Sequence, residues 1–328
     1  MQDQAAMARA VEAAGGVLGS TSPNPWVGAV LVTRDGESFV GATEPPGSRH
    51  AEIVAIDAAR AAGADVSGAT MYTTLEPCSH TGRTPPCTDA LLEAGVGRVV
   101  VGIEDPDPNV AGRGIEVLRR AGVDVTVGVL EDRVRGQLAP YLKHRRTGRP
   151  YVTLKMATTL DGRTAAADGS SRWITGEQAR ADAHRLRAVN DAVLVGAGTV
   201  RADDPELTVR LVEGRDPERV VLGRAPEGAR LHPALEMDGD LGGVLDDLGG
   251  RGIVSLLVEG GPRVAHSFHA AGLVDRYVVY LAPALMGGAD GRPVLDGPGA
   301  ATMADMWRGR VVSVEQLDPD IRIEMEPA

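Results

Sequence analysis

The chain has 328 residues, 43% of them hydrophobic, and its 34 basic and 45 acidic side chains give a formal net charge of −11. This length predicts about two domains, and the acidic balance argues against a broad nucleic-acid footprint, which needs a basic surface. No apolar run approaches the roughly 20 residues of a membrane span. Two cysteines and no apparent signal peptide lead us to expect a reducing, cytoplasmic location.

Strand and helix patterns alternate along the chain. In the first half we predict helices at 3–15, 50–62, 88–94 and 114–121 and strands at 27–32, 71–75, 98–101 and 123–127. In the second half we predict strands at 151–155, 192–195, 219–222, 254–258 and 276–281, a helix at 263–271, and a closing strand pair at 313–316 and 322–325. Residues 36–47 and 239–252 are interpreted as loops. The alternation predicts α/β sheets with crossover connections.

A basic segment, residues 141–150, separates the two halves of the chain. It ends in Gly148 and Pro150, which are residue types typical of a boundary. We therefore place one domain at residues 1–147 and the second at residues 150–328.

The most informative pattern is His50-Ala51-Glu52, followed by Pro77-Cys78 and then by Cys87. One imidazole, two thiols and a carboxylate in this order are typical of zinc deaminases, in which a His and two Cys hold Zn²⁺ and the Glu moves protons without binding the metal. Three protein ligands leave the fourth position of the ion open for water. The ion then lowers the pKa of that bound water to about 7. The pattern predicts a catalytic zinc site.

The gap between the cysteines is unusual, because eight residues separate Cys78 from Cys87 where the general deaminase signature has two. Cys87 is predicted to begin a helix, a position that lowers the pKa of a thiol and favours metal binding. Three other interpretations stay open: two buried structural cysteines, a disulfide, and a purely structural zinc site. Disulfides are rare in a reducing cytosol, and structural zinc ions normally have four protein ligands.

Further motifs surround this pattern. In the first half they are Ser22–Val30, His50–Glu52, Thr74–Cys87 and Asp105–Gly114, and in the second half they are Lys155–Gly162, Trp173–Thr175, Asp203–Arg210 and Val258–Gly261. Together they resemble the bifunctional riboflavin-biosynthesis deaminase–reductase family, with the deaminase motifs first. The resemblance covers nearly the whole chain, and the long cysteine loop is its most specific part.

The resemblance implies a fold, two reactions and two cofactors. The expected fold is a cytidine-deaminase-like α/β/α domain followed by a dihydrofolate-reductase-like α/β domain, with Zn²⁺ in the first and NADPH in the second. A phosphoribosylated diaminopyrimidinone is deaminated by hydrolysis, and its ribosyl chain is then reduced to a ribityl chain. The expected partner is this small molecule, without nucleic acid or membrane, and a homo-oligomer is left open.

The resemblance also implies roles for individual residues. The zinc ligands are His50, Cys78 and Cys87, Glu52 is catalytic, and the substrate contacts of the deaminase are Asn24, His80, Arg83, Asp105 and Asp107. The substrate contacts of the reductase are Lys155, Ser171, Arg187, Leu207, Arg210 and Glu259, and its cofactor contacts are Ala157, Trp173, Thr199, Asp203 and Gly261. Arg187 and Arg210 are suited to holding a phosphate through paired hydrogen bonds.

The segment between Arg210 and Glu259 is shorter than the family pattern, so we expect one strand–helix unit of the cofactor site to be missing or reshaped. One alternative function is therefore a zinc nucleobase deaminase whose C-terminal domain has lost or changed its reductase activity. A non-enzymatic alternative is a zinc-stabilised binding module with a cofactor sensor. Ammonia release over many turnovers would exclude that module.

Overall fold

The computed structural model describes residues 2–80, 85–108 and 110–328. The chain divides into two compact units, Met1–Gly148 and Arg149–Ala328. Each unit contains a mixed sheet with parallel strands and helices, so the predicted α/β fold class is confirmed. Within the described residues, no helix combines the length and the apolar character needed to cross a bilayer.

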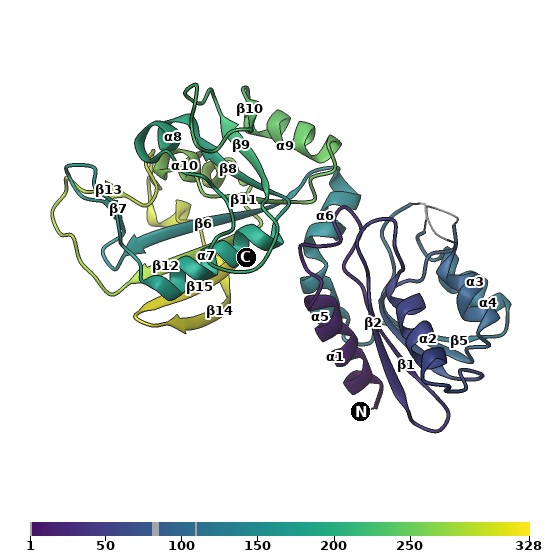
Figure 1. Cartoon of the computed structure of the whole chain (residues 1–328). Helices are drawn as coiled ribbons and strands as arrows, with labels where there is room; N and C mark the ends of the chain where they lie inside the picture. Colours follow the sequence, from purple (N-terminus) through teal and green to yellow (C-terminus); the bar gives the residue numbers. More distant parts are fainter. Residues whose placement is uncertain (1, 81–84, 109) are drawn as a thin grey trace. The chain divides into compact units, whose positions relative to one another are not determined.

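Unit 1 is built on a five-stranded sheet in the order β2-β1-β3-β4-β5 (Figure 1). The strands are β1 (Gly28–Val32), β2 (Ser38–Ala42), β3 (Thr70–Leu75), β4 (Arg98–Ile103) and β5 (Asp124–Val127). β1 runs antiparallel to both of its neighbours, whereas β3, β4 and β5 are parallel. The carboxyl ends of the parallel strands meet at one edge, which is where open α/β sheets bind ligands.

Helices cover both faces of this sheet. α1 (Gln2–Gly15) and α5 (Glu131–Gln137) lie on one face, and α2 (Ala51–Ala61), α3 (Cys87–Glu93) and α4 (Arg113–Arg120) lie on the other (Figure 1). Two glycines let helices approach closely: a Cβ atom would lie 1.9 Å from the Ala10 carbonyl oxygen of α1 at Gly28, and 2.1 Å from the Ala51 carbonyl oxygen of α2 at Gly41. Gly41 pairs with Ala29, the neighbour of Gly28, so these contacts are on opposite faces.

Unit 2 is built on an eight-stranded sheet in the order β10-β9-β8-β11-β6-β12-β15-β14. The strands are β6 (Tyr151–Thr159), β8 (Ala192–Gly196), β9 (Glu218–Leu222), β10 (Leu235–Met237), β11 (Ser255–Val258), β12 (Arg276–Ala282), β14 (Gly309–Leu317) and β15 (Asp320–Pro327). The first six strands of that order are parallel, and β15 and β14 are antiparallel additions at one edge. The shorter strands β7 (Arg163–Ala165) and β13 (Arg292–Pro293) form a separate pair.

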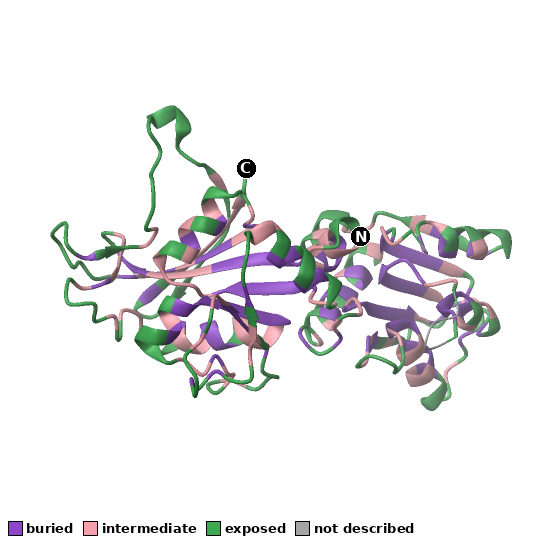
Figure 2. Ribbon diagram, turned by 90° about the horizontal axis from the view of Figure 1, so that it is seen from above, coloured by how far each residue is buried: buried purple, intermediate pink, exposed green. Residues whose placement is uncertain are grey.

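The core of unit 2 is centred on its parallel strands. Every residue of β8 and β11 is buried, as expected for continuous apolar strands covered on both faces (Figure 2). The helices of this unit are α7 (Glu177–Val189), α8 (Ala197–Asp203), α9 (Leu241–Gly250) and α10 (Pro262–Ala270), with a single 3-10 turn at Met303–Asp305.

Three segments differ from the sequence interpretation, and the helices α5, α7 and α8 lie where no element was predicted. Residues 36–47 contain β2 and residues 239–252 contain α9, although both were interpreted as loops. The basic boundary segment is largely the helix α6 (Ala139–Thr147), which ends at Gly148 in the left-handed conformation. Between β9 and β11 the chain keeps the strand β10 and the helix α9, so the strand–helix unit is present in a short form. The glycines in these two segments are typical of loops, so β2 and α9 were not predicted. They form because tertiary packing outweighs local propensity.

Candidate active sites

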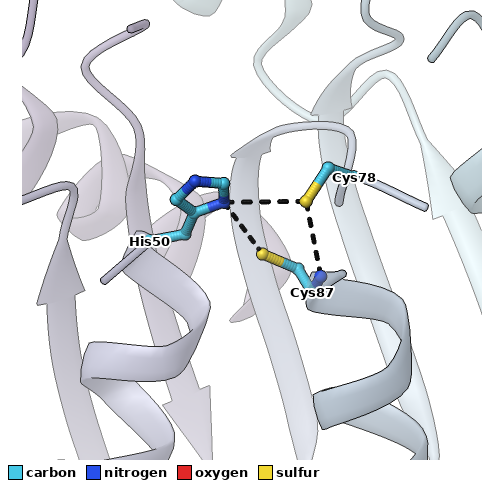
Figure 3. Close-up of side chains that lie close together, drawn as sticks. All are labelled: His50, Cys78 and Cys87. Carbon is cyan, nitrogen blue, oxygen red and sulfur yellow. Dashed lines mark hydrogen bonds between the residues drawn. The ribbon is translucent and has the colours of Figure 1, made fainter. Parts of the chain in front are cut away.

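The three predicted zinc ligands come from separate elements of unit 1. His50 precedes α2, Cys78 follows β3, and Cys87 begins α3. The His50 Nδ1 atom is 3.2 Å from the Cys87 Sγ atom and 3.6 Å from the Cys78 Sγ atom, and the backbone N–H of Cys87 donates to Cys78 Sγ at 3.3 Å (Figure 3). All three ligand atoms lie within 4.8 Å of one another, so the fold gathers them into one candidate metal site.

This donor set fits Zn²⁺, which prefers nitrogen and sulfur ligands and keeps an open position when the protein supplies three of them. Without a metal, the pKa values of the two neighbouring thiols shift in opposite directions. A hydrogen bond from Cys87 lowers the pKa of Cys78 to about 4, whereas the bond to Cys78, together with burial, raises the pKa of Cys87. In the metal-free cluster these contacts favour a negative charge on Cys78 over one on Cys87. The lowered pKa predicted for Cys87 at its helix start concerns the thiolate that binds a metal, and it stays a prediction.

Glu52 lies beside this cluster in the first turn of α2, and only 3% of it is exposed. The Cys87 thiol donates a hydrogen bond to its Oε2 atom at 3.5 Å. Burial raises the pKa of Glu52. A buried carboxyl group with a raised pKa, close to the ligands, is suited to taking up and returning a proton.

Glu76 is a buried carboxylate that sequence reasoning missed. It follows β3 directly, 4% of it is exposed, and it accepts hydrogen bonds from four backbone N–H groups. These donors are Asp105 and Gly112 to Oε2, at 3.2 and 2.9 Å, and Gly114 and Ile115 to Oε1, at 2.8 and 3.2 Å. Glu76 therefore ties the loop after β4 and the start of α4 to the chain just before Cys78. In the sequence, the position of Glu76 between a predicted strand and Pro77 was the feature that could have indicated its structural role.

Asp105 lies on the loop that Glu76 holds. It is 5% exposed, and its two carboxylate oxygens accept hydrogen bonds from the Tyr141 hydroxyl at 3.2 and 3.1 Å. Burial raises the pKa of Asp105 to about 6. Its Oδ1 atom also accepts from the backbone N–H of Asp107 at 2.9 Å, and the Asp107 carboxylate lies 3.8 Å from Arg145. Residues of α6 therefore hold both of these predicted substrate contacts, Asp105 through Tyr141 and Asp107 through Arg145.

Two other predicted substrate contacts of unit 1, Asn24 and His80, lie on loops. Asn24 is half-buried in the turn before β1, where its backbone N–H donates to the Thr21 carbonyl oxygen at 2.9 Å. His80 is exposed, two residues after Cys78. Arg83 lies outside the described residues.

All the residues predicted for the reductase site line one cavity of about 1710 Å³ in unit 2. Thr199 is on α8, after β8, and Gly261 lies between β11 and α10, where its backbone N–H donates to the Thr199 hydroxyl at 3.1 Å. Asp203 ends α8. Trp173 is 71% exposed, with the Arg180 guanidinium 4.6 Å from its ring centroid. The remaining lining residues of the prediction are Ala157, Ser171, Leu207, Lys155, Arg187, Arg210 and Glu259.

A charged group lies at the inner end of this cavity. The Arg187 guanidinium donates two hydrogen bonds to Glu259, at 2.6 and 3.0 Å, and a third to the Thr208 carbonyl oxygen at 3.1 Å. The Lys155 Nζ atom is 3.9 Å from Glu259. Burial lowers the pKa of Lys155. Burial also disfavours the charge of Glu259, but Arg187 and Lys155 outweigh it and lower the pKa of that carboxyl.

These contacts change the interpretation of the two arginines that were expected to hold a phosphate. Arg187 has its side chain only 13% exposed, and its donors are directed at Glu259 and Thr208, so here it supports a carboxylate and a loop. Arg210 has half of its side chain exposed, and it bonds to Glu206 at 2.7 Å and to the Thr208 hydroxyl at 2.8 Å. Of the pair, Arg210 is the one positioned to meet an anion.

His184 is a second residue that sequence reasoning missed. It lies one helical turn before Arg187 on α7, and 6% of it is exposed. Its Nδ1 atom accepts a hydrogen bond from the backbone N–H of Arg210 at 3.0 Å. Burial, followed by the charges of Arg187 and Arg210, lowers the pKa of His184 to about 4. The ring is therefore neutral near pH 7. In the sequence, the i, i+3 spacing of His184 to Arg187 was the feature that could have indicated its place in the site.

The comparisons with known proteins cover both units. The family model "Cytidine and deoxycytidylate deaminase zinc-binding region" matches residues 1–103, and the model "RibD C-terminal domain" matches residues 150–323. The riboflavin biosynthesis protein RibD of Mycobacterium tuberculosis is 44% identical over 98% of this chain and 96% of its own length. The Escherichia coli protein of the same name is 39% identical over 99% of both chains.

Solved structures agree with these matches. Acinetobacter baumannii RibD is 39% identical, with a TM-score of 0.92 over 100% of this chain and 99% of that chain. The diaminohydroxyphosphoribosylaminopyrimidine deaminase/5-amino-6-(5-phosphoribosylamino)uracil reductase of Thermotoga maritima is 38% identical, with a TM-score of 0.91 over 99% of both chains. Because these likenesses extend over the whole chain and include both domains, the chain belongs to the RibD family of riboflavin biosynthesis proteins, which join a zinc-dependent deaminase to an NADPH-dependent reductase.

Proposed function

We propose that unit 1 deaminates a phosphoribosylated diaminopyrimidinone by hydrolysis and that unit 2 then reduces the ribosyl chain of the product. These are the two activities named for the Thermotoga maritima relative. The observation that carries the proposal is a His/Cys/Cys cluster with a buried carboxyl group in the same chain as a second, separate cavity. The two reactions need different cofactors, and the chain offers a different kind of site for each.

In the deaminase we assign His50, Cys78 and Cys87 as the zinc ligands and Glu52 as the proton carrier. When bound, the ion acts as a Lewis acid that lowers the pKa of a water. Glu52 takes one proton from the attacking water and delivers it to the ring nitrogen. It then takes the second proton from the resulting hydroxyl group, as the carbonyl forms, and delivers it to the departing amino group, which leaves as ammonia. The raised pKa of Glu52 supports this role, because it eases the protonation that the return step requires.

The substrate contacts of the deaminase are proposed as the resemblance gives them. Asn24 meets the pyrimidine, His80 and Arg83 meet the phosphate, and Asp105 and Asp107 meet the ribose. The hydrogen bonds of Glu76 support the last assignment, because they hold the aspartate loop next to the chain that carries Cys78.

In the reductase the cavity would hold NADPH, which when bound would supply the hydride for reduction of the opened ribose. We assign Lys155 and Glu259 to orienting the sugar, and Arg187 to holding Glu259 in place. Arg210 meets the phosphate. The other substrate contacts are Ser171 and Leu207, and the cofactor contacts are Ala157, Trp173, Thr199, Asp203 and Gly261, all of which line the cavity.

We further propose functional domains at residues 1–147 and 150–328, a phosphoribosyl-pyrimidine as the partner, no nucleic-acid partner, and a cytoplasmic location, where the zinc thiols would stay reduced. A nucleobase deaminase with a changed C-terminal domain is not favoured, because the RibD C-terminal model matches residues 150–323. A single assay tests the proposal. The phosphoribosyl-pyrimidine is supplied with and without NADPH, and products are followed by mass spectrometry. Deamination in both samples and reduction only with NADPH is expected; reduction before deamination would contradict it.

A further inference from the structure

Glu76 lies where the chain of the zinc site meets the loop of the predicted ribose contacts. Its backbone N–H donates to the Ile103 carbonyl oxygen at 3.0 Å, which continues the pairing of β3 with β4 by one residue. Cys78, one of the assigned zinc ligands, follows Glu76 by two residues, and the Pro77 ring between them restricts the backbone. Asp105 follows the end of β4 by two residues. Glu76 therefore adjoins both segments, although Asp105 is 29 positions away in the sequence.

The carboxylate of Glu76 holds the aspartate and the start of a helix at once. Its Oε2 atom accepts from the backbone N–H groups of Asp105 and Gly112, and its Oε1 atom accepts from those of Gly114 and Ile115 in the first turn of α4. A helix leaves its first N–H groups unpaired, and a carboxylate at that end is favoured by the helix dipole. The residue before α4 is Gly112, which has no side chain to cap the helix. Glu76 therefore caps α4 from another strand and fixes the backbone of Asp105 with the same group.

The packing around this carboxylate leaves no room for another arrangement. A Cβ atom at Gly114 would overlap the Pro77 carbonyl oxygen and would lie 3.2 Å from the Oε1 atom of Glu76. Both Glu76 and Asp105 are buried. Because α4 packs directly against the chain that leads to Cys78, a change at Glu76 has to be taken up by the loop and the helix that it holds.

A second residue holds the side chain of Asp105. Tyr141 of α6 is buried, and its hydroxyl donates to both carboxylate oxygens of Asp105, at 3.2 and 3.1 Å. The Oδ1 atom of Asp105 in turn accepts from the backbone N–H of Asp107 at 2.9 Å. Glu76 thus fixes the main chain of Asp105, Tyr141 fixes its carboxylate, and Asp107 is placed through Asp105. Hydrogen bonds of this kind hold a binding residue in one orientation.

We propose that Glu76 and Tyr141 are positioning residues of the deaminase, which set the place of Asp105 relative to the zinc ligand Cys78. This inference rests on the proposed function, in which Asp105 and Asp107 meet the ribose. A substrate that reaches from the metal to these aspartates requires a fixed separation between them, because a small misplacement weakens its binding. Glu76 and Tyr141 therefore act on the binding of the substrate, whereas Glu52 acts on the proton transfer.

Steady-state kinetics of the full-length, zinc-loaded chain test the proposal. Glu76→Gln keeps the shape of the side chain but replaces one oxygen with an NH₂ group, which faces two N–H donors and bonds to neither. The KM for the phosphoribosyl-pyrimidine should rise by roughly 10–100-fold, while kcat changes less and zinc content stays the same. Glu116→Gln is the matched control, because Glu116 is in the first turn of the same helix, has its side chain 57% exposed and pairs with Arg120. It removes the same charge near α4 and should leave the KM unchanged.

A double-mutant cycle shows whether Glu76 acts through Asp105. Asp105→Ala should raise the KM by itself, and adding Glu76→Gln to it should change the KM much less than Glu76→Gln changes it in the wild-type chain, because the contact to be positioned is already lost. Fold-changes that multiply in the double variant overturn the proposal, and so does an unchanged KM in Glu76→Gln. An unchanged KM in Asp105→Ala contradicts the proposed ribose contact itself, and the positioning role falls with it. The single Asp105 variant therefore separates the two failures.

Zinc content of each variant reports that unit 1 is folded. If Glu76→Gln loses its zinc, Tyr141→Phe takes its place in the cycle. This change removes only the hydroxyl that holds the Asp105 carboxylate, and Tyr141 is on α6, away in the sequence from every zinc ligand. The KM should again rise, and this rise should disappear in the background of Asp105→Ala. A KM equal to that of the wild-type chain overturns the proposal.

Discussion

The two active sites of this chain differ in how their residues are distributed. In the deaminase the chemical residues are concentrated in two short motifs, His50–Glu52 and Cys78–Cys87, and the starts of α2 and α3 bring them together with the chain after β3. In the reductase the charged residues lie between positions 155 and 259, and long-range contacts connect them. A metal ion demands specific ligand types, so its site is visible in the sequence. A cofactor that carries its own reactivity needs mainly shape and orientation.

The largest expected effect is the loss of zinc from the deaminase site, with no effect on the reductase site. Cys78→Ser or Cys87→Ser should remove the Zn²⁺ and abolish deamination, because a hydroxyl is a poor substitute for a thiolate ligand. Metal analysis should fall from about one zinc per chain to none. NADPH oxidation with the already deaminated intermediate should persist at the wild-type rate. Full zinc occupancy in both variants would contradict the ligand assignment.

Glu52→Gln separates chemistry from metal binding within the deaminase. The amide keeps the size of the side chain but cannot accept the proton, so deamination should fall by about 10²–10⁴-fold. Zinc content and the reductase rate should stay unchanged. Steady-state ammonia release and metal analysis of the same sample decide the matter. A loss of zinc together with activity would show that Glu52 holds the metal or the fold instead.

The same contrast explains how much of the molecule could be predicted from its sequence. Strand and helix periodicity located the parallel strands except β10, and the zinc motif identified three residues, His50, Cys78 and Cys87, that the fold brings together. Glu76 escaped notice because its partners, from Asp105 to Ile115, are about 30–40 positions away and are backbone groups that no motif records. The pairing of Arg187 with Glu259 spans 72 positions and was hidden for the same reason. Side-chain identity predicts chemistry, but it does not predict which groups burial brings into contact.

Lys155→Ala tests whether the reductase can be disabled alone. Glu259 keeps its two hydrogen bonds to Arg187, so the buried carboxylate remains paired and unit 2 should stay folded. Loss of the ammonium group that we assign to orienting the sugar should slow reduction by roughly 10²-fold. Deamination should continue and its product should accumulate, which mass spectrometry can follow. Loss of both activities from a folded protein would contradict the model of two separate sites.

The smallest expected effect concerns His184, which lines the cavity of unit 2 and accepts a hydrogen bond from the backbone N–H of Arg210. His184→Leu removes the acceptor and leaves a backbone N–H group unpaired, at a cost of about 1–3 kcal/mol. Because that N–H belongs to the residue assigned to the phosphate, the KM for the deaminated intermediate should rise by roughly 5–100-fold, while kcat changes less. NADPH affinity should not change.

His184→Asn is the matched control, because Asn has the shape of Leu but places an amide oxygen near the position of Nδ1. It should restore most of the wild-type KM. Protonation does not complicate the comparison near neutral pH, since the pKa of His184 is about 4 and the ring is uncharged there. Equal KM values for the Leu and Asn variants would mean that His184 contributes packing alone. A recovery with Asn would show that the reductase site depends on a hydrogen bond accepted by a residue outside every recognised motif. The deaminase site differs, because its predicted catalytic residue and metal ligands all lie within motifs.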